Sequence, residues 1–259
     1  DDPIKSPHYE EITTVGRLEE VLRGLQSTKS DGRATTLSID TEGYPHAPWS
    51  VQFSYEPGTG YLIRATSELL LRRFGEIVRR IRPRLLYHSA LYDLIMERVL
   101  QLDLDGLIYD DTMVMAYLLQ LEAQGLKAGC LRHCNMRMSS YDDIIGDNAN
   151  DLAREYLTWI WDAEEYDYEE ARQAEFDKQI AQGRRIKVLP KLPKTSLHGA
   201  VRRILRSARP RALFLDQVED IQVAAYHRMC PLPEPSLDYI EPEKVITYGC
   251  RDADATLRY

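Results

Sequence analysis

The 259-residue sequence predicts an α/β domain in which helices flank a mixed sheet, interrupted by a mostly helical insertion. Three short β-rich runs follow one another near the beginning of the chain and predict an antiparallel meander. Two later steps from a strand to a helix add parallel strands to that sheet. A change of composition near residue 136 marks the start of the insertion.

An amphipathic helix is predicted before the meander, over residues 13 to 26, with Thr14 as its N-cap. The three runs of the meander cover residues 34 to 40, 49 to 55 and 61 to 63. After them come a helix between Ser67 and Pro83, a strand at 85 to 87, a helix at 90 to 100, a strand at 107 to 109 and a helix at 113 to 121. Asp111 or Thr112 can serve as the N-cap of the last of these helices.

The charge pattern of the insertion changes sign halfway. Residues 155 to 177 hold nine acidic residues against one basic residue, whereas residues 183 to 211 hold ten Lys or Arg and no acid. Prolines at 231, 233 and 235 predict an extended exit before a last helix at about 243 to 258. We therefore expect a core made of residues 1–135 and 236–259, with an insertion at residues 136–235.

The composition excludes several classes of protein. Hydrophobic residues make up 44% of the chain, and no apolar run is long enough for a membrane span. The net charge of −8 argues against a protein that coats nucleic acid, but not against an enzyme that grips one strand end. Four scattered cysteines and the lack of a secretory signal fit a reducing, cytoplasmic setting. Because the sequence begins without Met and stops inside a predicted helix, we expect a fragment of a longer polypeptide.

Acidic residues stand at chemically suggestive positions. Asp40 and Glu42 are separated by one residue at the end of a strand, so both side chains point to the same face and require a cation. Asp93 follows a strand on the first turn of a helix, and Tyr248 and Asp252, four residues apart, share a helix face. Each pattern alone also fits solvated acids or a charge that favours the helix dipole.

Five segments together resemble a known family. They are Leu37-Ser-Ile-Asp40-Thr-Glu42, His88-Ser-Ala-Leu-Tyr-Asp93, Asp111-Thr-Met-Val-Met-Ala-Tyr-Leu-Leu, Gly125-Leu-Lys127 and Tyr248-Gly-Cys-Arg-Asp252-Ala-Asp-Ala-Thr-Leu. This set is similar to the three Exo motifs and their connectors in the DEDD (DnaQ-like) exonucleases. It most resembles the 3′ to 5′ proofreading domain of phage-type family A DNA polymerases. The resemblance implies a ribonuclease H-like fold with a mixed five-stranded sheet.

The resemblance also implies roles for single residues. Asp40 would bridge two Mg²⁺ or Mn²⁺ ions, Glu42 and Asp252 would complete the site that activates water, and Asp93 would hold the second ion. Tyr248, which marks the DEDDy type, would aim the attacking water. Ser89 stands where the second motif usually has Asn, and it would contact the substrate or orient the loop of Asp93.

Other residues are candidates for binding nucleic acid. Lys127 belongs to one of the connectors of the resemblance. Arg202, Arg203 and Arg206 in the basic half of the insertion either grip a strand or pack against the acidic half. The aromatic residues Tyr156, Trp159 and Tyr166 follow helical spacing, which favours core packing over base stacking. Cys130 and Cys134 with His133 lack the spacing of zinc ligands and fit one helix.

The function implied by the resemblance is a metal-dependent 3′ to 5′ exonuclease that acts on the 3′ end of single-stranded DNA. We expect a monomer without membrane contact that proofreads for a polymerase domain following Tyr259. A 3′ to 5′ exoribonuclease similar to ribonuclease D remains an alternative, since no motif here reads the 2′ position of the sugar. A catalytically silent module that binds DNA or braces a polymerase is the alternative from another class.

Overall fold

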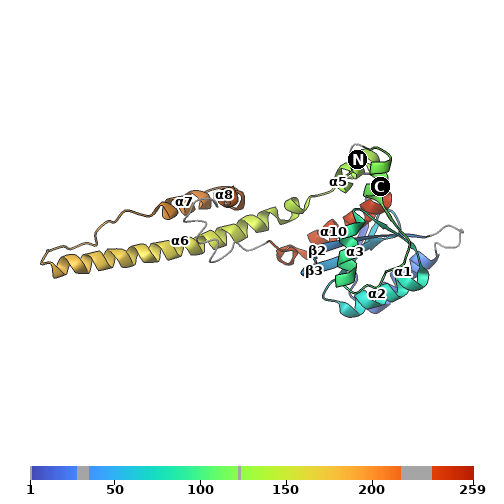
Figure 1. Cartoon of the computed structure of the whole chain (residues 1–259), viewed down its shortest axis with the longest axis horizontal. Coiled ribbons are helices and arrows are strands. Elements are labelled where there is room, and N and C mark those ends of the chain that lie inside the picture. The colour runs from blue at the N-terminus through green and yellow to red at the C-terminus, as the bar shows by residue number, and fades with distance from the viewer. Residues whose placement is uncertain (1, 28–34, 122–123, 217–234) are drawn as a thin grey trace. The chain divides into compact units, whose positions relative to one another are not determined.

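The computed structural model describes residues 2–27, 35–121, 124–216 and 235–259 (Figure 1). Its contacts divide the chain into two units, residues 1–144 with 240–259 and residues 145–239, which are described separately. Composition predicts the insertion at residues 136–235. Both predicted boundaries lie a few residues earlier in the sequence than the boundaries of the second unit, 145 and 239. The expected proline exit at 231 and 233 lies outside the described residues.

The first unit contains a six-stranded mixed sheet with the order β1-β4-β3-β2-β5-β6. The strands are β1 (His8–Glu11), β2 (Thr36–Tyr44), β3 (Ala47–Ser54), β4 (Thr59–Arg64), β5 (Arg84–Tyr87) and β6 (Tyr109–Asp111). The β2, β3 and β4 strands pair antiparallel as the predicted meander, and β5 and β6 add to β2 in parallel. This sheet, with helices on both faces, confirms the predicted ribonuclease H-like α/β fold class.

The predicted number of five strands is wrong, because β1 adds a sixth. Its four residues, His8 to Glu11, pair in parallel with Thr59 to Leu62 of β4 at the edge of the sheet. The segment His-Tyr-Glu-Glu has no β-branched residue and shows no apolar alternation, so no local pattern predicts it. Its strand conformation depends on β4, which lies far along the chain.

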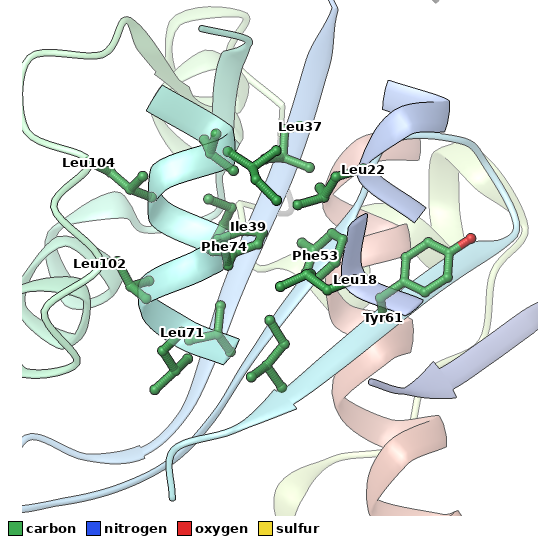
Figure 2. Close-up of a cluster of buried hydrophobic side chains, with 14 of the residues drawn as sticks. Leu18, Leu22, Leu37, Ile39, Phe53, Tyr61, Leu71, Phe74, Leu102 and Leu104 are labelled. Carbon is green, nitrogen blue, oxygen red and sulfur yellow. The ribbon is translucent and has the colours of Figure 1, made fainter. Parts of the chain in front are cut away.

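One face of the sheet packs against α1 (Val15–Ser27) and α2 (Glu68–Ile81). Figure 2 shows side chains from both helices meeting side chains of the central strands, among them Leu37 and Phe53. The ring centroids of Phe53 and Phe74 lie 4.8 Å apart. Each fully buried Leu or Phe side chain contributes roughly 1.5–3 kcal/mol to stability, so this cluster is the main source of stability in the first unit.

The other face of the sheet packs against α10 (Pro242–Arg258). The approach is close, because a Cβ atom at Gly60 of β4 would lie 2.6 Å from Cβ of Cys250. The Ser38 hydroxyl of β2 also donates a hydrogen bond of 2.7 Å to the carbonyl of Ala253. These contacts fix the position of α10 on the sheet.

The β2 strand is longer than predicted. Residues 34 to 40 were expected to be a strand that ends at Asp40, but β2 continues to Tyr44, with a bulge between Glu42 and Gly43. The antiparallel partner β3 supports this extension, whereas the parallel partner β5 pairs only with Thr36 to Ser38. Within the described part of the chain, no strand pairs with this edge of β2 beyond Ser38.

Asp111 joins the first turns of two helices, α3 (Ala90–Val99) and α4 (Thr112–Leu118). As the N-cap of α4 it accepts a hydrogen bond of 2.9 Å from the backbone N–H of Met113, which confirms one of the two predicted caps. The same carboxylate accepts from the backbone N–H groups of Ser89, at 3.1 Å, and Ala90, at 2.8 Å. It therefore fixes the start of α3 relative to the end of β6, where Asp111 is the last residue. The last short helix before the second unit is α5 (Leu126–Cys134), which carries Cys130 and Cys134 as predicted.

The second unit is helical where it is described. Its elements are α6 (Tyr141–Ala181), whose residues 141–144 belong to the first unit, α7 (Ser196–Leu205), α8 (Pro210–Asp216) and the 3₁₀ helix η2 (Leu237–Tyr239). Tyr156 packs in the buried cluster that joins α6, α7 and α8, as predicted. The prediction of core packing is wrong for Trp159 and Tyr166, which are 49% and 70% exposed. Among the described residues, no helix is long and apolar enough to cross a membrane.

We predict that Asp111→Ala destabilises the first unit by about 2 kcal/mol, because it removes the acceptor for the first turns of two helices. Denaturant unfolding measures the change. Asp110→Ala is the matched control, since the neighbouring Asp110 only pairs with the exposed Arg84. An exposed pair of this kind is worth at most about 1 kcal/mol. Equal losses from the two substitutions would contradict the double cap.

Candidate active site

Three carboxylates from distant parts of the sequence meet in the first unit. Oxygen atoms of Asp40, Glu42 and Asp252 lie within 4.8 Å of one another. Alternation along β2 places Asp40 and Glu42 on the same face as Ser38, and that face is covered by α10, which carries Asp252. Asp40 and Glu42 remain partly exposed while Asp252 is buried, so the cluster is open to solvent on one side.

Asp93 lies beside this cluster at the free edge of β2. Its carboxylate accepts a hydrogen bond of 2.7 Å from the Thr41 hydroxyl and another from the Thr41 backbone N–H. That N–H is available because β5 ends before it reaches Thr41. Thr41, the residue between Asp40 and Glu42, therefore holds Asp93 close to Asp40. Sequence reasoning missed Thr41, because it lies on the opposite face of β2 from Asp40 and Glu42.

The four carboxylates repel one another. Burial, followed by the charges of Asp93, Asp252 and Glu42, raises the pKa of Asp40 well above its usual range. Burial raises the pKa of Glu42 to about 8 and the pKa values of Asp93 and Asp252 to about 7.

Lys127 at the start of α5 is a cation whose charge acts on several of these groups. It lowers the pKa values of Asp40, Glu42 and Asp252, and Arg251 also lowers the pKa of Asp252. The net shifts are still upward, so these side chains do not balance the negative charge. A site of this kind favours an additional cation.

The donor set fits a divalent cation. Carboxylate oxygens are the ligands that Mg²⁺ and Mn²⁺ prefer, and no soft ligand belongs to the cluster of Asp40, Glu42 and Asp252. Ions bound there would stabilise the ionised forms that burial disfavours. The cluster therefore fits the predicted kind of metal.

Tyr248 lies one helical turn before Asp252 and is buried. Its hydroxyl forms a hydrogen bond with the carboxylate of Glu42. Burial, followed by the charges of Glu42 and Asp252, raises the pKa of Tyr248, so the hydroxyl stays protonated and donates this bond. The ammonium of Lys127 lies 4.9 Å from the centre of the Tyr248 ring, where a cation is attracted to the aromatic face.

Ser89 is the N-cap of α3 and adopts a left-handed backbone conformation with φ of 70°. Its side chain makes no capping hydrogen bond. Asn adopts this conformation more readily than Ser, which gives a physical reason for the Asn that the resemblance leads us to expect at this position. The Ser89 backbone therefore helps to orient Asp93 through α3, which sequence reasoning could not specify.

The three arginines predicted to bind nucleic acid belong to the second unit. Arg202 and Arg203 on α7 and Arg206 just after it are exposed, and they lie in a different unit from the carboxylates. The segment before α7 does pack against the acidic half of α6. There Lys194 forms an ion pair with Glu165, and the carbonyl of Pro190 accepts a 2.8 Å hydrogen bond from Arg172.

Comparisons with known proteins concern the fold of the chain. No protein-family model and no curated protein matches it. Similar solved structures are an apo form of a nuclease, with 18% identity and a TM-score of 0.35, and Brucella melitensis NrnC with bound Mg²⁺, with 22% identity and a TM-score of 0.31. The first match covers 54% of this chain and 65% of the nuclease, and the second covers 44% and 60%. Another structure of Brucella melitensis NrnC, 16% identical with a TM-score of 0.32, matches over 78% of this chain and 85% of its own length.

We predict that the metal-free protein loses stability as the pH rises from about 5 to about 8. Unfolded carboxyl groups titrate near pH 4. The folded cluster holds its protons to higher pH, since the pKa of Glu42 is about 8 and that of Asp252 about 7. The folded state therefore binds more protons across this range, and the free energy of unfolding falls as they are lost. Mg²⁺ should reverse the loss most strongly at high pH, because it binds the ionised carboxylates.

Thermal melting in a chelator and in Mg²⁺, at several pH values, measures this effect. Asp40→Asn should flatten the pH dependence and raise the melting temperature of the metal-free protein at about pH 8, because it removes repulsion. Glu97 also has a pKa raised to about 7 by burial, so the difference between wild type and Asp40→Asn isolates the contribution of the cluster. A wild-type melting temperature that ignores both pH and Mg²⁺ would rule out the proposed charge balance.

Proposed function

We propose that this protein is a metal-dependent 3′ to 5′ exonuclease that releases nucleotides from the 3′ end of single-stranded DNA. The convergence of Asp40, Glu42 and Asp252 within 4.8 Å supports this proposal, because two of these acids come from β2 and one from α10, more than 200 positions later in the sequence. Asp93 and Tyr248 complete the set. A module that only binds DNA would have no need of four acids in one place at a cost in stability.

The carboxylates would hold two divalent cations, Mg²⁺ or Mn²⁺. When bound, such ions would supply a water molecule that loses its proton easily and would balance the charge that develops on the phosphate. Asp40 would contact both ions, Glu42 and Asp252 would hold the one that activates water, and Asp93 the one near the leaving oxygen. Thr41 would keep Asp93 at the site through its two hydrogen bonds.

Tyr248 would position the attacking water. Its hydroxyl is protonated and already donates to Glu42, a group assigned to the water-activating ion. Because the phenol oxygen keeps its lone pairs while its proton is donated to Glu42, it can accept a hydrogen bond from the attacking water. Lys127, over the ring of Tyr248, would hold the ring in place and attract the phosphate backbone.

The choice of DNA and a role in proofreading are supported by the resemblance to polymerase domains. A polymerase would then be the partner of this chain. The rival, an exoribonuclease, uses the same acids and the same tyrosine, so the sugar must be tested directly.

The experiment compares matched single strands of DNA and RNA, labelled at the 5′ end, with and without Mg²⁺. We expect the DNA strand to shorten in single-nucleotide steps in Mg²⁺ only, and a 3′ phosphate to slow the reaction. Asp40→Asn should lower the rate by at least about a thousandfold, the loss expected when a shared metal ligand is removed. The exposed Asp105 provides the control substitution Asp105→Asn, which should retain the wild-type rate.

Three results would contradict the proposal in different ways. Degradation from the 5′ end would refute the polarity, and faster degradation of RNA would favour the exoribonuclease. Full activity of Asp40→Asn would refute the assigned site.

The role of Tyr248 gives a separate prediction. Tyr248→Phe removes the hydroxyl but keeps the ring beneath Lys127, so it should lower kcat by about ten- to a hundredfold. Asp252→Asn removes a metal ligand and should cost far more. Binding of Mn²⁺, measured by calorimetry, should be nearly unchanged in Tyr248→Phe and weakened in Asp252→Asn. Equal losses of activity and of metal affinity would show that the tyrosine acts as a ligand.

A further inference from the structure

A cavity of about 370 Å³ opens beside the carboxylates, within the first unit. It shares Tyr248 and Asp252 with the candidate site and continues along α10 past Thr247 and Lys244. The opposite wall comes from the segment between α5 and α6, at Ser139, and from the first turn of α6. Its volume is at the lower end of the range for small-molecule pockets, about 300–1,000 Å³, and so suits one nucleotide unit better than a duplex.

The polar groups of this cavity suit a phosphate and a sugar. Lys244 and Arg251 contribute two positive charges, and Ser139 and Thr247 contribute hydroxyl groups. Glu243 and Asp252 contribute two negative charges, but Asp252 is one of the proposed metal ligands and would be neutralised by the ion. With metal bound, the balance in the cavity is therefore positive.

Arg251 has an unused donor. Its Nε atom is buried and has no hydrogen-bond partner among the described residues, and its terminal nitrogen lies as far as 3.5 Å from the carboxylate of Asp2. A buried guanidinium nitrogen without an acceptor costs stability, and an anionic oxygen would offset this cost. Phosphate suits arginine because two of its oxygens can accept from neighbouring N–H groups.

Resting on the proposed function, the geometry points to this cavity as the binding site for the second phosphate from the 3′ end of the strand. The reasoning is chemical. A nucleotide released from a 3′ end carries one phosphate, the one that is cleaved, and that phosphate must lie at the metal ligands. A cationic cavity directly beside them therefore serves the next phosphodiester, on the side of the strand that remains.

Lys244 and Arg251 then bind the oxygens of this phosphodiester, and Thr247 and Ser139 face its sugar. Lys244 is available at small cost, because its contact with Glu241 is an exposed pair at 3.1 Å. The cavity thereby holds the strand while the terminal nucleotide leaves. It also favours substrates of at least three nucleotides over a dinucleotide without a 5′ phosphate, which lacks this second phosphate.

The experiment measures binding separately from cleavage. All variants carry Asp40→Asn to stop hydrolysis, and fluorescence anisotropy follows the binding of a short single-stranded DNA in Mg²⁺. A second strand has an uncharged methylphosphonate at the second linkage from the 3′ end. We expect Lys244→Ala to weaken binding of the normal strand about tenfold, or ~1.4 kcal/mol. It should also flatten the salt dependence by about 0.7, the value for one phosphate contact with a single strand.

The decisive comparison is between the two strands. The methylphosphonate should weaken binding to the Asp40→Asn parent by a similar factor, and Lys244→Ala should then cause no further loss. Arg251→Gln should behave in the same way, while Arg251→Lys should restore part of the affinity. The control is Arg98→Ala, since Arg98 is exposed on α3 and does not line the cavity. This control should leave the binding of both strands unchanged.

Several outcomes would overturn this inference. Lys244→Ala could weaken the binding of both strands equally, or it could leave the binding of both unchanged. It could also weaken only the binding of a competing nucleoside 5′-monophosphate, which would assign the cavity to the released product. Cleavage by the wild-type protein in Mg²⁺ is scored independently. Cleavage that does not depend on Lys244 refutes the subsite alone, whereas binding that depends on Lys244 without any cleavage refutes the proposed exonuclease.

Discussion

The repulsion among Asp40, Glu42, Asp93 and Asp252 is the constraint on which the rest of the first unit depends. Their pKa values are raised, so without metal the folded protein is more stable when these carboxyl groups carry protons than when they are ionised. Only a rigid scaffold can hold such groups together. The scaffold consists of a central strand paired with β3 from Ser38 to Tyr44, a helix packed closely on the sheet, and a second helix fixed at its first turn by Asp111.

The unequal lengths of β2 and β5 explain how the fourth acid enters the site. If β5 continued beside β2, the backbone N–H of Thr41 would pair with it and α3 would begin further away. Because β5 ends at Tyr87, the chain turns at Ser89 in a left-handed conformation, and Asp93 takes the place of the missing strand. The same interruption of the sheet therefore leaves room for a carboxylate and supplies the donors that orient it.

The sequence predicts those parts of the site that depend on local periodicity. Alternation places Asp40 and Glu42 on one face, and the spacing of four places Tyr248 with Asp252. It does not predict β1 or the extension of β2, because both depend on partners elsewhere in the sheet. Apolar spacing on α6 also overstates packing, since it fits Tyr156 but not Trp159 or Tyr166. A long helix places more residues at helical spacing than its partners α7 and α8 can cover.

The contacts within the second unit show which residues of the basic half of the insertion pair with its acidic half. If the basic half simply neutralised the acidic half, the arginines of α7 would face the acids of α6. Instead, Val201 and Ile204 of α7 pack into the apolar cluster. In the segment before α7, Lys194 forms an ion pair with Glu165 and the Thr195 hydroxyl donates a hydrogen bond to Glu164. The carbonyl of Pro190 accepts a hydrogen bond from Arg172. Arg202 on α7 and Arg206 just after this helix remain exposed. Among the described residues, the contacts of Lys194 and Thr195 with the acids of α6 therefore come from the segment before α7.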